Sequence, residues 1–239
     1  MSESVREADG GRRPRVTRDR ALRAAVALAD EAGLESVTMR SLAQELGVVP
    51  MALYKHVANK DDLVDGMVDI IVGEIDPAVA DADWKSAVRE QILSARRALL
   101  RHRWARAAIE SRTTMSPVLL AYVESLIGLF RAGGFSVDLT HHVLHALAGR
   151  MWGFTQEVFA DPPASEAADV DTEAQAAALQ GMAKKYPYSH EIAMAIAHDE
   201  SSVVGGGCDD QFEFEFALDI LLDGFERLHQ QGWTSAGRH

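Results

Sequence analysis

The chain has 239 residues, 47% of them hydrophobic, which is enough apolar material for one large or two modest domains. No stretch approaches the roughly 18 uncharged apolar residues of a membrane helix, and the polar N-terminus lacks the apolar core of a signal peptide. A transmembrane helix and export are therefore not expected. The single Cys208 excludes an internal disulfide, which fits a reducing cytoplasm.

The net charge of −12 is distributed unevenly along the chain. Residues 1–60 hold ten Lys and Arg against eight Asp and Glu, whereas residues 61–239 hold fourteen against twenty-eight. An acidic surface repels nucleic acid, so only the N-terminal part suits an anionic partner. That part begins with a run of arginines, namely Arg12, Arg13, Arg15, Arg18, Arg20 and Arg23.

One amphipathic helix is predicted before a pair of shorter helices, and another is predicted after it. The first spans residues 17 to 32, with alanine, leucine and valine at helical spacing, and it ends at Gly33. The later one can be capped by Asn59, and its first turn carries Asp61 and Asp62, which favour the positive end of the helix dipole.

Between them, the stretch from Thr38 to Val57 predicts a helix-turn-helix. Thr38 can cap a helix, Gly47 can end it in the left-handed conformation, and Pro50 suits the first turn of the next helix. Leu53 and Val57 lie four residues apart and would face the core. The free face would then present Pro50, Met51, Ala52, Tyr54, Lys55 and His56. An ordinary helical hairpin with a solvated face is the alternative.

The remainder of the chain also predicts helices, so the expected fold class is all-α. The main helices are expected at about 84–102, 117–130, 138–159 and 211–230, with loops at 161–175 and 201–210. The predicted organisation is a flexible basic arm at 1–16, a helix-turn-helix domain with a linker helix at 17–75, and a helical ligand-binding and dimerisation domain at 76–239.

Three side chains on one predicted helix have the chemistry of a metal site. His141 and His145 are four residues apart, which is zinc-ligand spacing on a helix, and Glu157 follows on the same helix. One interpretation is a helical metal-dependent hydrolase that uses these residues. The alternative is that the histidines line a ligand pocket or a dimer interface, because no His-Glu-x-x-His pattern is present.

Several short runs carry a resemblance to a known family. They are Ala32-Gly33-Leu34, Val37-Thr38-Met39-Arg40, Leu42-Ala43-Gln44-Glu45-Leu46-Gly47-Val48, Ala52-Leu53-Tyr54-Lys55-His56-Val57 and Asn59-Lys60-Asp61-Asp62-Leu63. With them, residues 17–75 resemble the DNA-binding head of the tetracycline-repressor (TetR) family. Trp84, the run at 99–102, the run at 132–135, Gly153 with Glu157, and the run at 214–224 resemble the ligand-binding domain of the tetracycline-repressor subgroup.

The resemblance implies a set of contacts with operator DNA. It implies that Thr38, Tyr54, His56 and Lys60 lie on phosphates or the groove wall, and that Arg40, Pro50, Met51, Ala52 and Lys55 lie near bases. The chemistry of these side chains fits, because Arg and Lys can donate to guanine and small apolar groups can contact thymine methyls.

The resemblance also implies a small-molecule effector in the second domain. The expected pocket residues are Trp104, Met115, His145, Met151, Trp152, Phe154 and Glu157, and no cofactor is expected. The tetracycline repressor coordinates a magnesium-bound drug through a His and a Glu; Glu157 matches the Glu, but Ile109 falls near the His position. We therefore expect an apolar or aromatic effector rather than magnesium–tetracycline.

The final helix is apolar on more than one side, which one chain cannot easily cover. A homodimer is therefore expected, with Leu218, Leu222 and Phe225 near the interface. Together these features predict a dimeric, ligand-responsive transcriptional repressor that is cytoplasmic, is not an enzyme and binds no membrane. The hydrolase and a DNA-binding regulator without a small-molecule effector remain the alternatives.

Overall fold

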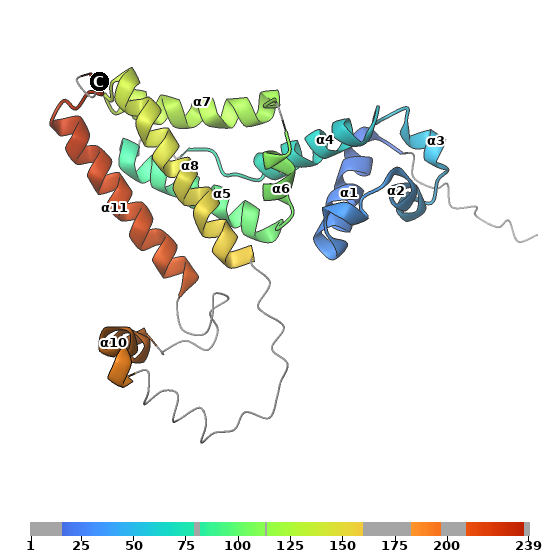
Figure 1. Cartoon of the computed structure of the whole chain (residues 1–239). Coiled ribbons are helices and arrows are strands. Elements are labelled where there is room, and N and C mark those ends of the chain that lie inside the picture. Colours follow the sequence, from blue (N-terminus) through green and yellow to red (C-terminus); the bar gives the residue numbers. More distant parts are fainter. Residues whose placement is uncertain (1–15, 79–81, 113, 160–182, 197–208, 237–239) are drawn as a thin grey trace, which may run out of the picture. The chain divides into compact units, whose positions relative to one another are not determined.

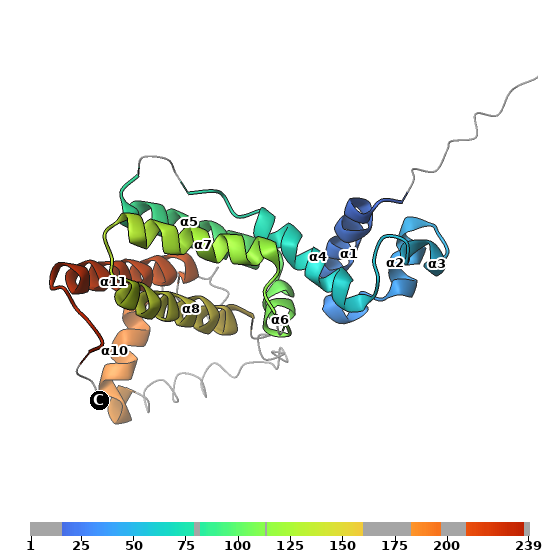
Figure 2. The same ribbon diagram turned by 90° about the horizontal axis from the view of Figure 1, so that it is seen from above.

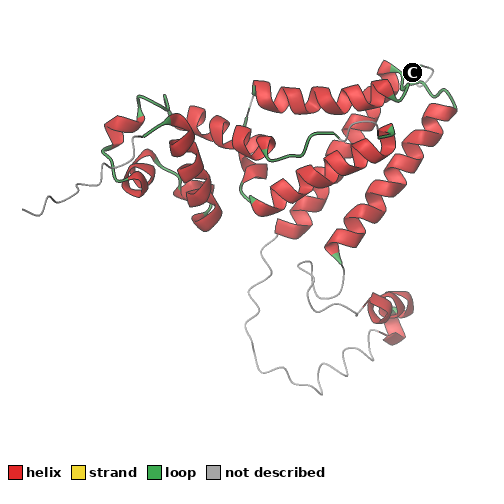
Figure 3. Cartoon of the chain, turned by 180° about the vertical axis from the view of Figure 1, so that it is seen from behind, coloured by secondary structure: helices red, strands yellow, loops and turns green. Residues whose placement is uncertain are grey.

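The computed structural model describes residues 16–78, 82–112, 114–159, 183–196 and 209–236, and every regular element in those ranges is a helix (Figure 3). Contacts divide the chain into two compact units (Figure 1). The N-terminal unit combines residues up to Ile75 with residues 97–120, and the C-terminal unit combines residues 76–96 with residues from Ala121 onward. None of the described helices is long and apolar enough to cross a bilayer.

The α-helices of the N-terminal unit form around one apolar core. They are α1 (Arg18–Ala32), α2 (Met39–Leu46), α3 (Pro50–Leu53), α4 (Lys60–Gly73) and α6 (Ala105–Glu110), with a short 3-10 helix at Leu34–Ser36. Thr17, Thr38 and Asn59 cap α1, α2 and α4, because each side-chain oxygen accepts a backbone N–H of the first turn. Helix α1 packs on α2 and α4, and fully buried Leu42 and Leu63 lie in this core.

The turn between α2 and α3 has the predicted geometry. Gly47 has a φ of 66° in the left-handed region, and its N–H donates to the carbonyls of Ala43 and Gln44, so α2 ends there. Pro50 occupies the first turn of α3, where its missing N–H has no consequence. Leu53 and Val57 are buried. The predicted helix-turn-helix is therefore confirmed, and α3 is fixed to the core from one side.

The C-terminal unit contains α8 (Val137–Phe159), α10 (Pro187–Ile196) and α11 (Asp210–Gln230). It also contains most of α5 (Trp84–Arg101) and of α7 (Pro117–Ala132). Helix α8 packs along α11, as Figures 1 and 2 both show. Trp84 anchors an aromatic cluster, with ring centroids 5.7 Å from Phe130 and 4.6 Å from Phe135. Any side chain at Gly133 would clash with Trp84, since its Cβ would lie 2.7 Å from that ring.

Helix α11 presents three different sides. One side is buried, with Phe214, Leu218, Leu222 and Phe225 in the core. A second side carries acidic residues that pair with α5: Lys85 lies 2.6 Å from Asp223 and 2.8 Å from Glu226, and Arg89 lies 2.6 Å from Glu215 and 2.7 Å from Asp219. The third side is apolar but exposed, with Phe212, Phe216 and Ile220 at 60%, 54% and 55% exposure.

Candidate functional site

The surface of α3 brings together several of the predicted contact residues. Pro50, Met51, Tyr54 and Lys55 are exposed, and Met51 is 72% exposed although it is apolar. Ala52 and His56 are half-buried. Val49, which precedes α3, is another large apolar side chain left in solvent. This is a surface with small and apolar groups beside one cation, as base edges and thymine methyls would require.

Two predicted contact residues also hold the local fold. The Thr38 hydroxyl accepts the backbone N–H of Ser41 at 3.0 Å, and the Ser41 hydroxyl accepts the N–H of Thr38 at 2.9 Å, which forms a reciprocal capping box. The carbonyl of His56 accepts a hydrogen bond from Arg18 at 2.9 Å. Arg40, on the first turn of α2, and Lys60, the first residue of α4, are both exposed.

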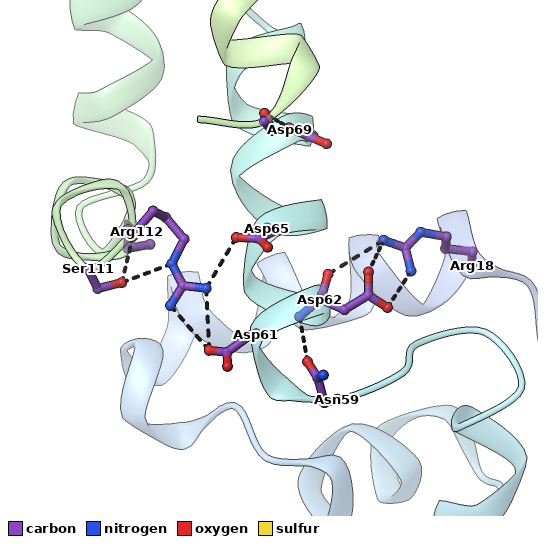
Figure 4. Close-up of polar contacts among 10 residues, drawn as sticks. Arg18, Asn59, Asp61, Asp62, Asp65, Asp69, Ser111 and Arg112 are labelled. Atoms are coloured by element: carbon purple, nitrogen blue, oxygen red, sulfur yellow. Dashed lines mark hydrogen bonds and ion pairs between the residues drawn. The ribbon is translucent and has the colours of Figure 1, made fainter. Parts of the chain in front are cut away.

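Arg18 fixes the two long helices of the N-terminal unit to each other. Figure 4 shows its guanidinium forked onto Asp62, with Nη2–Oδ1 at 2.6 Å and Nη1–Oδ2 at 2.9 Å. Asp62 also accepts the N–H of Ala58 at 2.7 Å, and its own N–H donates to Asn59. The hydrogen bond from Arg18 lowers the pKa of the Asp62 carboxyl. Arg18 is therefore a structural residue, whereas Arg12, Arg13 and Arg15 lie outside the described residues.

A row of aspartates on α4 receives the segment that follows α6 (Figure 4). Asp61, Asp65 and Asp69 are four residues apart, so they lie on one face of the helix. Arg112 bonds Asp61 at 3.4 Å and Asp65 at 3.2 Å, and the Ser116 hydroxyl donates to Asp69 at 2.5 Å. The sequence interpretation missed this contact, although the i, i+4, i+8 spacing of the acidic residues was visible.

A second polar junction lies at the other end of α4. His102 is 8% exposed, and its ring nitrogens face Asp30 at 2.7 Å and Glu74 at 3.3 Å. The Trp104 indole donates to the same Asp30 oxygen at 2.7 Å, and Arg101 donates to Glu74. Trp104 was predicted to line the effector pocket, but its polar atom is bonded to α1 within the N-terminal unit.

The other predicted pocket residues are not gathered in one place among the described side chains. Met115 is exposed in the segment before α7, His145 is exposed on α8, and Met151 is buried on α8. Trp152, Phe154 and Glu157 belong to α8, but their side chains lie outside the described residues. The hydrolase alternative also depends on Glu157, so its predicted constellation lies partly outside the described residues.

The interior of the C-terminal unit holds a polar pair that the sequence interpretation missed. Gln91 on α5 is 4% exposed, and its amide donates to the Ser125 hydroxyl on α7 at 3.1 Å. Its carbonyl oxygen, Oε1, is buried and has no hydrogen-bond partner among the described residues. One turn away on α7, burial raises the pKa of the Tyr122 phenol. A buried acceptor without a donor is costly, and a bound molecule with a hydroxyl group would supply the donor.

The magnesium site of the tetracycline repressor does not fit the described residues. Ile109 on α6, which falls near the position of the family His, has a hydrocarbon side chain and cannot bind a metal. Within the described part of the chain, no group of three or more His, Cys, Asp or Glu side chains is placed to hold a metal ion.

Comparison with family models matches both units of the chain. A model described as the tetracyclin repressor-like C-terminal domain matches residues 76–229. A model for bacterial regulatory proteins of the tetR family matches residues 21–67. The matched ranges together cover the helix-turn-helix and nearly all of the C-terminal helices.

Individual relatives agree with these matches. An HTH-type transcriptional regulator of Saccharopolyspora erythraea is 35% identical over 124 residues, which is 52% of each chain. The chain spans about half the length of the first curated relatives that it matches. The class C tetracycline repressor of Escherichia coli is 30% identical over 219 residues, which is 90% of this chain and 92% of the relative. The structure of ActR from Streptomyces coelicolor in complex with actinorhodin superposes with a TM-score of 0.67 at 27% identity, over 91% of this chain and 99% of ActR.

The Arg18–Asp62 pair predicts a specific loss of stability in acid. The Asp62 pKa is lower in the folded state than in the unfolded chain, where it is about 3.9. The pair therefore stabilises the fold above that pH, and the contribution is lost as the pH falls through the folded pKa. Because both side chains are partly exposed, Asp62→Asn should lower the free energy of unfolding at neutral pH by only about 1 kcal/mol.

Urea unfolding of both proteins over a pH series measures this effect. The difference between them should shrink as the pH falls below about 3.9, because Asp62 is protonated first in the unfolded chain and then, at lower pH, in the folded state. Asp19→Asn is the matched control, since it removes an exposed pair with Arg23 on the same unit and should change stability little. A difference for Asp62→Asn that stayed constant down to that pH would contradict the ionic origin.

Proposed function

The chain belongs to the tetracycline-repressor (TetR) family of bacterial regulatory proteins, and we propose that it is a dimeric repressor that a small molecule releases from operator DNA. The exposed surface of α3 carries the proposal. Val49 and Met51 are large apolar side chains in solvent, and Lys55 is also exposed. Leu53 is buried and fixes the same helix, α3, to the core. A structural hairpin would not need such groups on its free face, whereas a major-groove helix does.

The proposed contacts divide into two kinds. Arg40 and Lys55 would read guanine edges, and Met51 would lie against thymine methyls. Lys60, at the start of α4, would hold a phosphate near the positive end of that helix. The acidic remainder of the chain favours docking through the N-terminal unit, and DNA binding implies a cytoplasmic protein.

We propose that the effector binds beside Gln91, between α5 and α7. Gln91 offers a buried oxygen without a donor among the described residues, and Tyr122 and Ser125 add hydroxyl groups from α7. The surroundings are apolar, since Val88 and Leu126 are buried on the same two helices. An aromatic molecule with a hydroxyl donor fits this chemistry, as pockets between helices commonly combine apolar walls with few polar groups.

The same two helices provide a route from the effector to the DNA-binding helices. Residues 97–120 comprise the last turn of α5, the connecting segment with α6, and the first turn of α7. Within the N-terminal unit this segment bonds α4 through Arg112 and Ser116. A ligand that moves α5 relative to α7 would therefore displace the segment that holds α4. Release requires that the ligand bind the displaced state more tightly than the operator-bound state.

The proposed dimer uses a different side of α11 from the one predicted. Leu218, Leu222 and Phe225 are buried within one chain, so they pack beneath the proposed interface and do not form its surface. The exposed Phe212, Phe216 and Ile220 lie four residues apart and form an apolar stripe that the described residues leave uncovered, on the helix that packs along α8. A second copy that pairs its α8 and α11 with this stripe would bury it in a four-helix interface.

DNA binding tests the repressor proposal directly. The protein should bind a palindrome selected from random DNA more tightly than a scrambled sequence. Arg40→Ala should cost on the order of 1–3 kcal/mol for the operator and relax preference at one base pair of each half-site. Lys60→Ala should weaken both DNAs alike and flatten the salt slope by about one unit. Fluorescence anisotropy over a salt series measures both effects.

Arg227→Ala is the matched control, because Arg227 is an arginine on α11, far along the chain from the N-terminal unit. It should leave both affinities unchanged. Equal loss on operator and scrambled DNA for Arg40→Ala would show that Arg40 contacts phosphate rather than a base. If the intact protein bound no palindrome better than scrambled DNA, the repressor proposal would fail.

Release from the operator tests the effector site. Actinorhodin, present in the related ActR structure, is the probe, and tetracycline with magnesium is the comparison. Actinorhodin should release the protein, whereas magnesium–tetracycline should not, because Ile109 cannot coordinate the metal. Gln91→Met should weaken the actinorhodin effect up to about tenfold, the equivalent of one hydrogen bond, without lowering the free energy of unfolding.

Ser94→Ala, also on α5, is the control and should have the opposite effects on stability and on the actinorhodin response. Ser94 is buried, accepts the N–H of Asp76 and donates to its carboxylate, so both of its bonds are made. Its removal should lower stability and leave the actinorhodin response unchanged. An identical response of wild type and Gln91→Met would contradict the placement of the effector beside Gln91.

Sedimentation equilibrium tests the dimer. The protein should be a homodimer at about micromolar concentration, and Phe216→Glu should give a folded 26.1 kDa monomer, because an interface cannot bury an unpaired carboxylate. Val137→Glu, on an exposed apolar residue at the first position of α8, is the control and should remain dimeric. Leu222→Asp should unfold the C-terminal unit instead. A wild-type monomer at that concentration would refute the proposed dimer.

A further inference from the structure

We propose that Met51 is a site of reversible oxidation by hydrogen peroxide, and that its sulfoxide weakens the recognition of operator DNA. This inference rests on the proposed role of α3 in reading bases. Met51 is 72% exposed on α3, a helix of four residues that buried Leu53 holds against the core. Leucine at this position would offer a similar apolar contact, but methionine adds a sulfur atom that a mild oxidant converts into a polar group.

The other described methionines differ from Met51 in exposure or in position. Met115 is 60% exposed in the segment between α6 and α7, Met39 is half-buried, and Met67 and Met151 are buried. Because a dissolved oxidant reaches exposed sulfur atoms first, Met51 and Met115 should react while the buried ones are protected by the fold. Helices α3 and α6 lie at opposite ends of the N-terminal unit in Figures 1 and 2. Met115 is therefore an exposed methionine outside the proposed DNA-reading surface.

The reaction of Met51 with hydrogen peroxide is an oxygen transfer. The thioether sulfur attacks one peroxide oxygen, the O–O bond breaks and an S–O bond forms, and the other oxygen leaves as water with both protons. The sulfur loses two electrons and the peroxide gains them. Methionine sulfoxide reductases, with a thiol as electron donor, reverse the change, so the site is able to act as a switch.

The sulfoxide changes what the surface of α3 can contact. A thioether is apolar and a weak acceptor, whereas the sulfoxide oxygen is a polar acceptor. A thymine methyl offers it no donor, and the neighbouring purine N7, guanine O6 and thymine O4 atoms are themselves acceptors. Oxidation adds no net charge, so the phosphate contacts that govern non-specific affinity should not change. The expected signature is a loss of operator affinity with no loss of affinity for unrelated DNA.

The experiment compares the full chain before and after treatment with hydrogen peroxide. Trypsin places Met39, Met51 and Met115 in three different peptides, so mass spectrometry follows the oxidation of each. Fluorescence anisotropy then measures binding to the selected palindrome and to scrambled DNA. Oxidation should weaken palindrome binding about tenfold or more, the cost of one buried acceptor without a donor, and should leave scrambled binding and the salt slope unchanged. Reductases for both sulfoxide epimers, with dithiothreitol, should restore the affinity.

Three variants, each compared with its own untreated form, locate the effect. Met51→Leu has no sulfur at this position, so peroxide should not change its operator affinity, whatever that affinity is before treatment. Met115→Leu is the matched control and should lose affinity on oxidation as the wild type does. Cys208→Ser removes the only thiol of the chain and should also respond as the wild type does. Circular dichroism checks that each treated protein is still folded.

Bound DNA supplies an independent readout of the same site. The palindrome should slow the oxidation of Met51 and leave that of Met115 in the same sample unchanged. An unchanged operator affinity after complete oxidation of Met51, an equal loss on both DNAs, or a loss that persists in Met51→Leu would overturn the inference and leave the repressor proposal standing. If the untreated protein bound no palindrome better than scrambled DNA, the repressor proposal would fail first, and this inference with it.

Discussion

Polar pairing along α4 joins it to α1 and to the segment after α6, at the edge of the apolar core of the N-terminal unit. Asp62 takes the fork of Arg18 from α1, while Asp61, Asp65 and Asp69 take Arg112 and Ser116 from the segment after α6. The helix thus carries polar partners on two sides, and its apolar side meets the core. The buried residues of α4, among them Leu63, Met67 and Ile71, hold it in the core, and the polar partners on its other sides fix which segments it meets.

Local chemistry made the helix-turn-helix predictable from the sequence. Thr38, Gly47 and Asn59 act through neighbours within a few residues, as helix caps or as the left-handed end of a helix. Their effect does not depend on the rest of the fold. The exposure of Met51 and Lys55 was also predictable from near neighbours, because buried Leu53 fixes which side of the short helix α3 faces inward.

Long-range pairing made the polar contacts of Trp104 and Gln91 unpredictable from the sequence. Trp104 lies among apolar and aromatic residues in the sequence, which favours a pocket, but its indole is bonded to Asp30, which is 74 residues away. Gln91 carried no signal in the sequence, since a glutamine on an amphipathic helix is normally solvated. Only its tertiary position shows that the amide reaches Ser125 on another helix and leaves Oε1 without a donor among the described residues. Such a residue is recognised from burial rather than from its neighbours in the chain.

Helix α11 shows why an apolar sequence alone does not identify an interface. Its residues are apolar on two sides, and periodicity cannot tell which of the two meets the rest of the same chain. The ion pairs to Lys85 and Arg89 settle the question, because they fix the rotation of α11 about its axis against α5. With that rotation, Leu218 and Leu222 turn inward, and Phe212, Phe216 and Ile220 are left in solvent. Large apolar side chains in a row at helical spacing are costly to hydrate, so a surface of this kind is best explained by a partner that covers it.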